Sequence, residues 1–482
     1  MQEAKGRKLP STMPIYKILR NTNNRKKRSL RHYQIEGIKR GAGKNSLYLA
    51  MEMRLGKTLT AIRWLDEKKD AKLVFVFAPK TVLISWEREL YEEGKEYYSL
   101  VGLPGQTKLE AIREATRGYY LCNYEALLCD GIPSTLERKR PDAFILDEST
   151  VIKNPRAKTT KKLLGLCDSI KYKCCLSGLP APESWQDIWS QMAFLNDGYW
   201  MGTCSFYKWL MLYATKDMYG WIFTPRQAVT IKTAYQNESF CLTRKEAGLG
   251  ETKVYQCRSD ALTGDSLRLY GEISNRWAIP SYNQMEEEAN ETVYSVVVHS
   301  WLRRLCGGFL PAQHFQVWKY AEALSIISAA AKNREPLIVW FCFNDEIKAL
   351  SDYVKKMAPD LFKKVKTLTG NDSQTTRRAV VDDFQRGRID YLFIQQKIGR
   401  FGLDLSRSDT AVYFSNAYNL ELRMQSEDRI VLPGKNRPLL YIDFITKNTL
   451  EEKVIDDLRN KKIDARWLTA RPQILDQSRS RP

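Results

Sequence analysis

The chain has 482 residues and a formal net charge of +20, and 43% of its residues are apolar. This composition supplies packed cores and excludes disorder over most of the chain, and the length predicts about two to four domains. No apolar stretch approaches the roughly 18 residues of a membrane span, and the N-terminus lacks the apolar core of a secretory signal, so membrane residence is disfavoured. The excess of positive charge predicts a polyanionic partner, either nucleic acid or an anionic membrane surface, with an inert basic surface as the alternative.

The cysteines do not form a metal-binding or disulfide pattern. Ten are scattered through apolar surroundings without a repeated C-x-x-C spacing, and there are only three histidines. A zinc site is therefore not expected, and reduced cysteines in a cytosolic or nuclear compartment fit better than a disulfide framework.

The first part of the chain predicts a basic arm followed by an α/β domain. Residues 1–29 are polar and end in the basic run Asn24–Arg28, which is read as a solvated arm or, more sharply, as a nucleic-acid contact or import signal. From 30 to 184, helical stretches alternate with apolar runs, which are Leu73–Ala78, Tyr119–Cys122, Ala143–Leu146 and Tyr172–Leu176. Apolar strands separated by helices predict a parallel sheet covered on both faces.

A second α/β domain is predicted beyond a helical stretch. Residues 185–330 are rich in Trp, Tyr and Met with few strand runs, which favours a helical insertion and linker. From 331 to 465 the apolar runs return, and they are Leu337–Phe343, Val365–Leu368, Tyr391–Ile394, Ala411–Phe414 and Leu439–Ile442. The tail, residues 466–482, shows no clear periodicity.

The first chemical motif is a glycine turn between a strand and a helix. The apolar run Leu47–Ala50 leads to Gly56, Lys57 and Thr58, and a helix-like stretch follows. Backbone N–H groups at such a turn bind phosphate, the lysine adds charge and the threonine hydroxyl can hold Mg²⁺. Met51 occupies the first glycine position of the full phosphate-loop pattern, so a chance Gly-Lys-Thr remains the alternative.

The second motif is a pair of carboxylates at the end of a predicted strand. Asp147 and Glu148 follow the apolar run that begins at Ala143. An Asp there suits a Mg²⁺ ligand and a Glu can orient or deprotonate an attacking water. Acidic pairs also occur in ordinary loops, but together with the glycine turn they predict a nucleotide hydrolase.

With both motifs in place, the chain resembles a superfamily-two helicase of the Swi/Snf-related class of DNA translocases, from about residue 30 to 445. In the first part, the family motifs are matched by Arg31–Gly37, Ala50–Thr58, Phe77–Glu89, Cys122–Glu125, Asp147–Pro155 and Leu176–Pro182. Class-specific helical segments resemble Trp189–Asn196 and Cys241–Lys245. In the last part, the matches are Thr369 with Gly370, Arg377, Arg378 and Phe384, then Lys397–Leu405 and Gln425–Ile430.

The resemblance implies two RecA-like parallel-sheet P-loop domains in tandem, with ATP and Mg²⁺ as cofactors. Lys57 and Thr58 would hold phosphate and metal, Asp147 the metal, and Glu148 the water. Gln34 would read the adenine, and Arg429 of the second domain would reach the γ-phosphate across the cleft. The further implied nucleotide contacts are Arg31, Gly56, Gly402 and Asp404, and the implied DNA-backbone contacts are Lys80, Asn123, Tyr124, Arg377, Arg378 and Lys397.

The sequence also departs from the family pattern. Arg54 and Arg400 replace family glycines, Leu179 replaces a threonine, and Leu432 stands where the family usually has its second arginine. An arginine finger is worth about 10³ to 10⁵ in rate in other phosphoryl-transfer enzymes, so its loss would leave a slow ATPase. Arg429 alone, or Arg400 moved into the cleft, could substitute, and the sequence does not decide between them.

The expected function is an ATP-dependent translocase on double-stranded DNA that remodels DNA structures or protein–DNA complexes. Two alternatives stay open: a strand-separating or annealing DNA or RNA helicase, and a DNA-binding scaffold with a weakened ATPase. We expect a minimal bacterial or phage-like motor that acts in the cytoplasm, or in the nucleus if the source is eukaryotic, with any targeting partner unknown. The positive charge is expected to line one groove along both α/β units.

Overall fold

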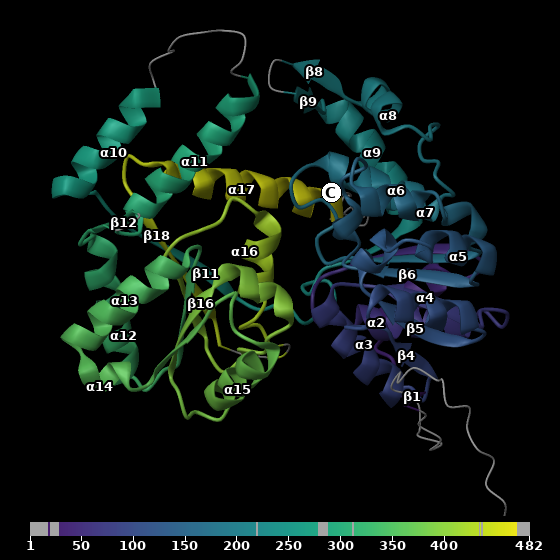
Figure 1. Ribbon diagram of the computed structural model, residues 1–482, viewed down its shortest axis with the longest axis horizontal. Coiled ribbons are helices and arrows are strands. Elements are labelled where there is room, and N and C mark those ends of the chain that lie inside the picture. The colour runs from purple at the N-terminus through teal and green to yellow at the C-terminus, as the bar shows by residue number, and fades with distance from the viewer. Residues whose placement is uncertain are drawn as a thin grey trace, which may run out of the picture. The chain divides into compact units, whose positions relative to one another are not determined.

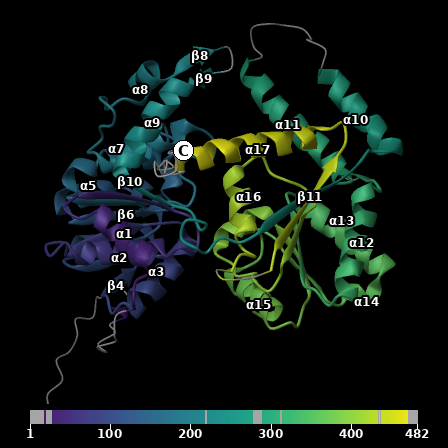
Figure 2. The same cartoon turned by 180° about the vertical axis from the view of Figure 1, so that it is seen from behind.

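The computed structural model describes residues 18–19, 28–217, 220–277, 288–310, 313–432, 434 and 437–469. These residues pack into two units, whose helices and strands are labelled in Figures 1 and 2. Of the described residues, the first contains those up to 181 together with 185–242 and 468–469. The second contains 182–184 and 243–467. Most of the expected basic arm and of the C-terminal tail lies outside the described residues.

The first unit is built around an eight-stranded sheet with the order β1-β4-β5-β3-β6-β7-β2-β10. All neighbouring strands are parallel except β1 and β4. The strands are β1 (Ile18–Leu19), β2 (Ser46–Met51), β3 (Leu73–Phe77), β4 (Tyr97–Ser99), β5 (Gly118–Cys122), β6 (Ala143–Asp147), β7 (Tyr172–Leu176) and β10 (Ser239–Leu242). The hairpin strands β8 (Thr215–Asp217) and β9 (Gly220–Ile222) lie apart from this sheet.

Helices of the first unit follow most of its strands along the chain. They are α1 (His32–Arg40), α2 (Lys57–Asp66), α3 (Lys80–Glu92), α4 (Gly105–Glu114), α5 (Ile132–Lys139), α6 (Lys158–Leu164), α7 (Trp189–Leu195), α8 (Phe206–Tyr213) and α9 (Pro225–Glu238), with the short 3₁₀ turns η1 (Tyr124–Leu128), η2 (Ser149–Ile152), η3 (Cys167–Ser169) and η4 (Trp185–Ile188). Leu73, Phe75 and Phe77 of β3 pack in one core with side chains of α4 to α7. The intervening residues of β3 are also buried, so both faces of the sheet are covered.

The second unit has a six-stranded, fully parallel sheet with the order β11-β18-β17-β14-β16-β15. Its strands are β11 (Lys253–Asp260), β14 (Leu337–Phe341), β15 (Val365–Leu368), β16 (Tyr391–Gln395), β17 (Thr410–Tyr413) and β18 (Leu439–Thr446), and β12 (Phe309–Leu310) pairs separately with β13 (Gln313–His314). Its helices are α10 (Gly264–Trp277), α11 (Glu288–Cys306), α12 (Trp318–Lys332), α13 (Asn344–Met357), α14 (Pro359–Phe362), α15 (Gln374–Gln385), α16 (Leu420–Glu427) and α17 (Leu450–Thr469), with the 3₁₀ turn η5 (Gln396–Phe401).

Strand β14 shows why an uninterrupted apolar run folds as a central strand. Leu337, Val339 and Phe341 belong to a core on one face of the sheet, while Ile338 and Trp340 belong to a separate core on the other face. Because side chains alternate along a strand, only a continuous apolar run satisfies both faces. The nine runs expected from Leu73–Ala78 to Leu439–Ile442 all form strands of the two sheets, which confirms two parallel-sheet α/β domains in tandem.

The stretch 185–330 contributes to both units. Residues 185–242 belong to the first unit and residues 243–330 to the second. Besides its helices, this stretch supplies an outer strand to each sheet, β10 beside β2 and β11 beside β18 (Figure 2). Our five-segment division of the chain stays a prediction, and the stretch between the two α/β blocks contains more strand than its composition indicated.

Candidate functional site

The glycine turn of the first unit places a lysine and backbone N–H groups at the start of a helix. Strand β2 ends at Met51, Gly56 has a φ of 78°, and α2 begins at Lys57. No side chain caps α2, which leaves the backbone N–H groups of its first turn directed at the loop. The Lys57 ammonium donates to the backbone oxygens of Met51 (2.9 Å) and Glu52 (3.4 Å) inside the loop. The donors expected for a bound phosphate are thus present together.

Asp147 lies at the carboxyl end of β6 and is almost fully buried. Its carboxylate accepts hydrogen bonds from Trp86 Nε1 (2.7 Å) and from the backbone N–H of Glu148 (2.9 Å), and the Tyr124 hydroxyl donates to its carbonyl (2.9 Å). Burial raises the pKa of Asp147, while the Lys57 ammonium and the Trp86 hydrogen bond oppose the rise. This carboxylate is fixed in direction and lies within the electrostatic reach of Lys57.

Glu148 follows with a left-handed backbone, at a φ of 50°. Non-glycine residues adopt this region at a cost of roughly 1–3 kcal/mol, and they do so mostly at functional sites. The strained position turns the chain sharply after β6 and begins the 3₁₀ turn η2. The expected water-orienting residue therefore sits at a local bend held by the surrounding fold.

Gln34 and Arg31 lie beside the glycine turn. Gln34 is buried in the first turns of α1, its side-chain oxygen accepts the Arg31 backbone N–H (2.9 Å), and its amide nitrogen donates to the Gly56 carbonyl (3.4 Å). A Cβ on Gly56 would lie 2.4 Å from that nitrogen, so a larger residue would displace the Gln34 amide, and the φ of 78° independently favours glycine. The expected adenine reader is thus joined to the phosphate loop.

The segment Leu176–Pro182 also borders the phosphate loop. A Cβ on Gly178 would lie 3.3 Å from the Met53 side chain and 3.6 Å from the Lys57 ammonium. The backbone N–H of Leu179, which stands where the family has threonine, donates to the Ser177 hydroxyl (3.1 Å). The first unit therefore brings together Gln34, Arg31, Gly56, Lys57, Thr58, Asp147 and Glu148 around one loop.

In the second unit, the expected nucleotide residues flank the packing of η5 on α16. Gly402 has a φ of 65°, and Asp404 is exposed in the loop after it. The backbone N–H of Leu405 donates to the Arg429 carbonyl (3.1 Å), which fixes this loop beside Arg429. Arg429 is half-buried and Leu432 is exposed, whereas the side chain of Arg400 lies outside the described part of the chain.

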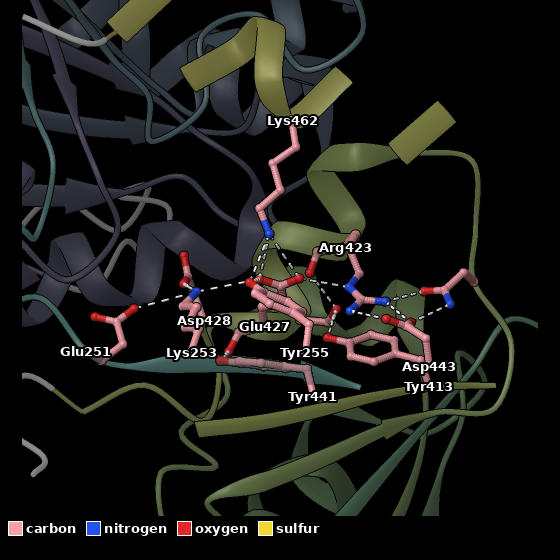
Figure 3. A network of polar contacts seen from close by, with 12 residues as sticks. Glu251, Lys253, Tyr255, Tyr413, Arg423, Glu427, Asp428, Tyr441, Asp443 and Lys462 are labelled. Carbon is pink, nitrogen blue, oxygen red and sulfur yellow. Dashed lines mark hydrogen bonds and ion pairs between the residues drawn. The ribbon is translucent and has the colours of Figure 1, made fainter. Parts of the chain in front are cut away.

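A network of buried charges holds the segment just before Arg429 (Figure 3). We define it by Glu427 and Asp428 with the cations that pair with them, Arg244, Lys253, Arg423 and Lys462. Glu427 accepts from Arg423 Nε (2.9 Å) and from the Tyr255 hydroxyl (2.8 Å), and Asp428 accepts from Arg244 (2.8 Å). Burial would raise the pKa of Glu427, but Lys462, Lys253 and Arg423 outweigh it and hold that pKa well below its ordinary value.

The expected DNA contacts divide into exposed and buried residues. Lys80, Arg378 and Lys397 are exposed, and Arg377 is half-buried with its guanidinium donating to the Gly370 carbonyl (2.8 Å). Asn123 and Tyr124 are buried instead. The Asn123 side chain accepts from Lys108 (3.0 Å) and donates to Glu125 (2.5 Å), while the Tyr124 hydroxyl supports Asp147. In this structure those two side chains make hydrogen bonds inside the first unit, and their role as DNA contacts stays a prediction.

Lys397 borders a basic cavity of about 410 Å³ in the second unit, beside the first turn of α13. Arg303 and Arg304 also line it, together with Gln395 and Gln396. Arg303 donates to the Asn416 carbonyl (2.5 Å) and stacks on the rings of Phe343 and Tyr418, so its charge is held in a fixed place. The lining also includes Asp345, whose carboxylate pairs with Arg304 (3.4 Å). Three cations against one carboxylate leave the lining with a net positive charge, which suits an anion.

The described residues contain neither a membrane-spanning helix nor a cluster of metal-ligating side chains. None of the helices traced in the structure has the length and apolar composition to cross a membrane. Within the same ranges, His, Cys, Asp and Glu side chains do not gather in groups of three or more that could hold a metal ion.

Comparison with family models identifies the family to which the chain belongs. The SNF2-related domain model matches residues 33–239, and the helicase conserved C-terminal domain model matches residues 318–433. The chain belongs to the SNF2-related helicase family. Together the two matches cover about two thirds of the chain in the order expected from the motifs, so the resemblance to the Swi/Snf-related class is confirmed. This is a family of ATP-dependent enzymes. The Lys57 ammonium and the N–H groups at the start of α2 fit the phosphates of a nucleoside triphosphate.

Curated relatives of this SNF2-related chain are longer proteins. It is 23% identical to an uncharacterized ATP-dependent helicase of Mycoplasma pneumoniae, over 92% of the chain and 43% of the relative. It is 24% identical to the putative ATP-dependent helicase/translocase YwqA of Bacillus subtilis, over 86% of the chain and 45% of the relative. With the ISWI chromatin-remodeling complex ATPase ISW2 of Saccharomyces cerevisiae the values are 22%, 90% and 40%. The chain spans less than half the length of these relatives.

Among solved structures, the Sulfolobus solfataricus SWI2/SNF2 ATPase core in complex with dsDNA matches with a TM-score of 0.42 at 23% identity. The match covers 92% of this chain and 95% of that one.

The sequence did not predict individual roles for two residues, Trp86 and Arg244, that contact the candidate nucleotide-binding residues or their neighbours. Trp86 was seen only as part of a family segment, yet its indole N–H fixes the Asp147 carboxylate. Arg244 likewise was only part of the class-specific segment, yet it pairs with both Asp428 and Glu251. Both act through long-range contacts, over 61 and 184 residues of chain, which no local pattern displays.

Proposed function

We propose that the chain hydrolyses ATP in the presence of Mg²⁺ and uses the energy to translocate on double-stranded DNA. The observation that carries the proposal is the geometry of the first unit, where Lys57 at the start of α2, the buried Asp147 carboxylate and Gln34 surround one loop. A loose phosphoryl-transfer transition state gains most from charge and donors fixed in advance, and this loop supplies them.

Each residue of the phosphate loop has a proposed role. The N–H groups of the first turn of α2 and the Lys57 ammonium would bind the β- and γ-phosphates. Thr58 and Asp147 would hold the metal, which supplies charge to neutralise the phosphate oxygens. Glu148 would accept a proton from, or orient, the attacking water. Gln34 would hold the adenine, and the roles of Arg429, Gly402 and Asp404 toward the nucleotide stay predictions.

Double-stranded DNA as the track is supported by charge and by the relatives. The net charge of +20, the exposed Lys80, Arg378 and Lys397, and the basic cavity all favour a phosphate backbone. The Bacillus relative is named a helicase/translocase and the Saccharomyces one a chromatin-remodeling ATPase, which agrees with movement on DNA as the use of the hydrolysis.

The proposal is tested by ATP turnover with duplex DNA, single-stranded DNA and RNA side by side at one stated salt concentration. We expect duplex DNA to stimulate turnover most. Lys57→Ala and Glu148→Gln should each lower the stimulated kcat at least about 10²-fold, because each removes a group that acts on the transition state. Displacement of a third strand from a duplex reports translocation, and a forked substrate reports strand separation.

A matched control is available in the same unit. Lys44 also follows a glycine, Gly43, but its ammonium donates to the Asn237 carbonyl (3.4 Å), outside the phosphate loop. Lys44→Ala should therefore keep wild-type turnover. Equal turnover by Lys57→Ala and wild type, or tight DNA binding by a wild-type protein that never hydrolyses ATP, would overturn the proposal, and the second result would favour a scaffold.

A further inference from the structure

Three polar side chains meet in the interior of the first unit. The Tyr48 hydroxyl donates to the side-chain oxygen of Gln191 (2.6 Å), and the Ser149 hydroxyl donates to the same oxygen (2.7 Å). The two hydroxyl oxygens lie 3.2 Å apart. All three residues are fully buried, and burial raises the pKa of Tyr48 well above its ordinary value, so the tyrosine stays neutral.

The Gln191 amide uses its full hydrogen-bonding capacity. Its nitrogen donates to the backbone carbonyls of Pro180 (2.9 Å) and Asp187 (2.7 Å), while its oxygen accepts the two hydroxyls. A primary amide has two N–H donors and two acceptor positions, and all four are occupied here. A reversed amide would set its oxygen against two carbonyls, so this orientation is the one that the surroundings permit.

Three of the four partners of Gln191 lie in segments that border the phosphate loop, and the fourth, Asp187, lies in η4 one turn before Gln191. Tyr48 is in β2, which leads into the phosphate loop, and Ser149 directly follows Asp147 and Glu148. Pro180 is in the segment whose Gly178 approaches the Lys57 ammonium. Gln191 itself is on α7, outside these segments. One buried side chain therefore joins strand β2, the turn after β6 and the segment after β7.

We infer that Gln191 is a positioning residue for the hydrolysis site, acting through Ser149 on Glu148 and through Pro180 on the segment beside Lys57; this inference rests on the proposed function. The bend at Glu148 is strained, and strained backbone persists only where the surroundings over-determine it. The Ser149 contact supplies that constraint one residue away. A displacement of about 1 Å at a reacting group can cost on the order of 10²-fold in rate, so a buried amide outside the site can control turnover.

The test compares Gln191→Met and Ser149→Ala with wild type. Gln191→Met keeps the length and volume of the side chain but removes all four hydrogen bonds, and Ser149→Ala removes one of them. The control is Ser169→Ala, which removes a hydroxyl bonded to the Leu166 carbonyl (2.7 Å) just before β7, at the opposite end of that strand from the phosphate loop. The measurements are kcat, KM for ATP, binding of a non-hydrolysable ATP analogue, and amide hydrogen exchange.

We expect both test variants to lower kcat about tenfold while analogue affinity stays within about twofold, the pattern of a lost transition-state contact. Amide exchange should accelerate in residues 147–152 and 177–182. Ser169→Ala should leave kcat and exchange in both segments unchanged. Unchanged exchange in both segments, or a kcat loss matched by Ser169→Ala, would overturn the inference. If wild type itself lacks ATPase activity, the proposed function fails, and the exchange data still decide whether Gln191 positions the two segments.

Discussion

Arg54 occupies a glycine position of the family's phosphate loop and keeps the backbone that a glycine would adopt, with a φ of 66°. A left-handed conformation costs an ordinary residue roughly 1–2 kcal/mol. The fold tolerates this cost in the loop whose Met51 and Glu52 carbonyls accept from Lys57. The departure from the family pattern is therefore in the side chain and not in the backbone.

The left-handed backbone at Arg54 predicts the effects of two substitutions there. Arg54→Gly should fold and retain ATP affinity, because glycine adopts the observed φ freely. Arg54→Val should lower ATP affinity about tenfold, because a β-branched residue in this region forces the loop to rearrange. ATP affinity and thermal unfolding should be measured together.

The control for residue 54 is Arg334→Val, at a φ of 56° between α12 and β14 of the second unit. It should lower the thermal unfolding temperature without changing ATP affinity. Equal ATP affinity in Arg54→Val and wild type would contradict the predicted role of the loop backbone.

At the residue scale, the sequence predicted the strands that precede the two chemical motifs. The apolar runs before Glu52 and up to Leu146 form β2 and β6, which lead to Lys57 and Asp147. The burial of Asn123 and Tyr124 did not follow, because it depends on Lys108 and on the Asp147 carbonyl, which the motif does not contain. All the functional roles assigned to these residues stay predictions.

At the scale of elements, the buried charge network joins β11, α16 and α17. Glu427 of α16 contacts Lys253 and Tyr255 of β11 and Lys462 of α17. Strand β11 is mostly exposed and has no apolar run, so its pairing with β18 is supplemented by these contacts. The sequence therefore did not predict β11 as a strand, because the contacts that hold it are with residues far away along the chain.

Glu427→Gln should lower the free energy of unfolding of the second unit by about 3–5 kcal/mol at neutral pH, because it leaves buried cations without their partner. The pKa of Glu427 is held below its ordinary value, so its contribution is complete above the unfolded pKa of about 4.3 and is lost as pH falls toward the folded value. The difference between variant and wild type should therefore shrink as the pH is lowered from about 5 to about 3.

Urea-unfolding midpoints at several pH values measure this prediction. The matched control is Asp382→Asn on α15, whose carboxylate pairs with Arg386 at 2.9 Å while both side chains are more than half exposed. Such an exposed pair contributes little, so this variant should unfold like wild type. A variant–wild-type difference for Glu427→Gln that stays constant across the acid range would contradict the assigned ionisation.

At the scale of the whole chain, the sequence predicted the two sheets but not the sharing of residues 185–330 between them. Central parallel strands can be recognised in the sequence as apolar runs, because they are buried on both faces. The outer strands β10 and β11 depend on partners about 190 residues away along the chain, β2 at one end and β18 at the other, so their identity is a property of tertiary structure.

The net charge of +20 predicts that DNA binding depends on salt. Binding that neutralises DNA phosphates weakens as the salt concentration rises, and the dependence is steeper when more phosphates are contacted. A plot of log affinity for duplex DNA against log salt should be linear, and Lys397→Ala should reduce its slope by about 1 with no change in sequence preference. Lys363→Ala is the matched control, because Lys363 is an exposed lysine of the same unit that pairs with Asp360 (2.8 Å) and does not line the basic cavity. Fluorescence anisotropy with one labelled duplex at four salt concentrations suffices. If Lys363→Ala changed the slope as much as Lys397→Ala, binding would depend on the overall positive charge and not on specific lysines. That result would contradict a DNA contact at the basic cavity beside Lys397.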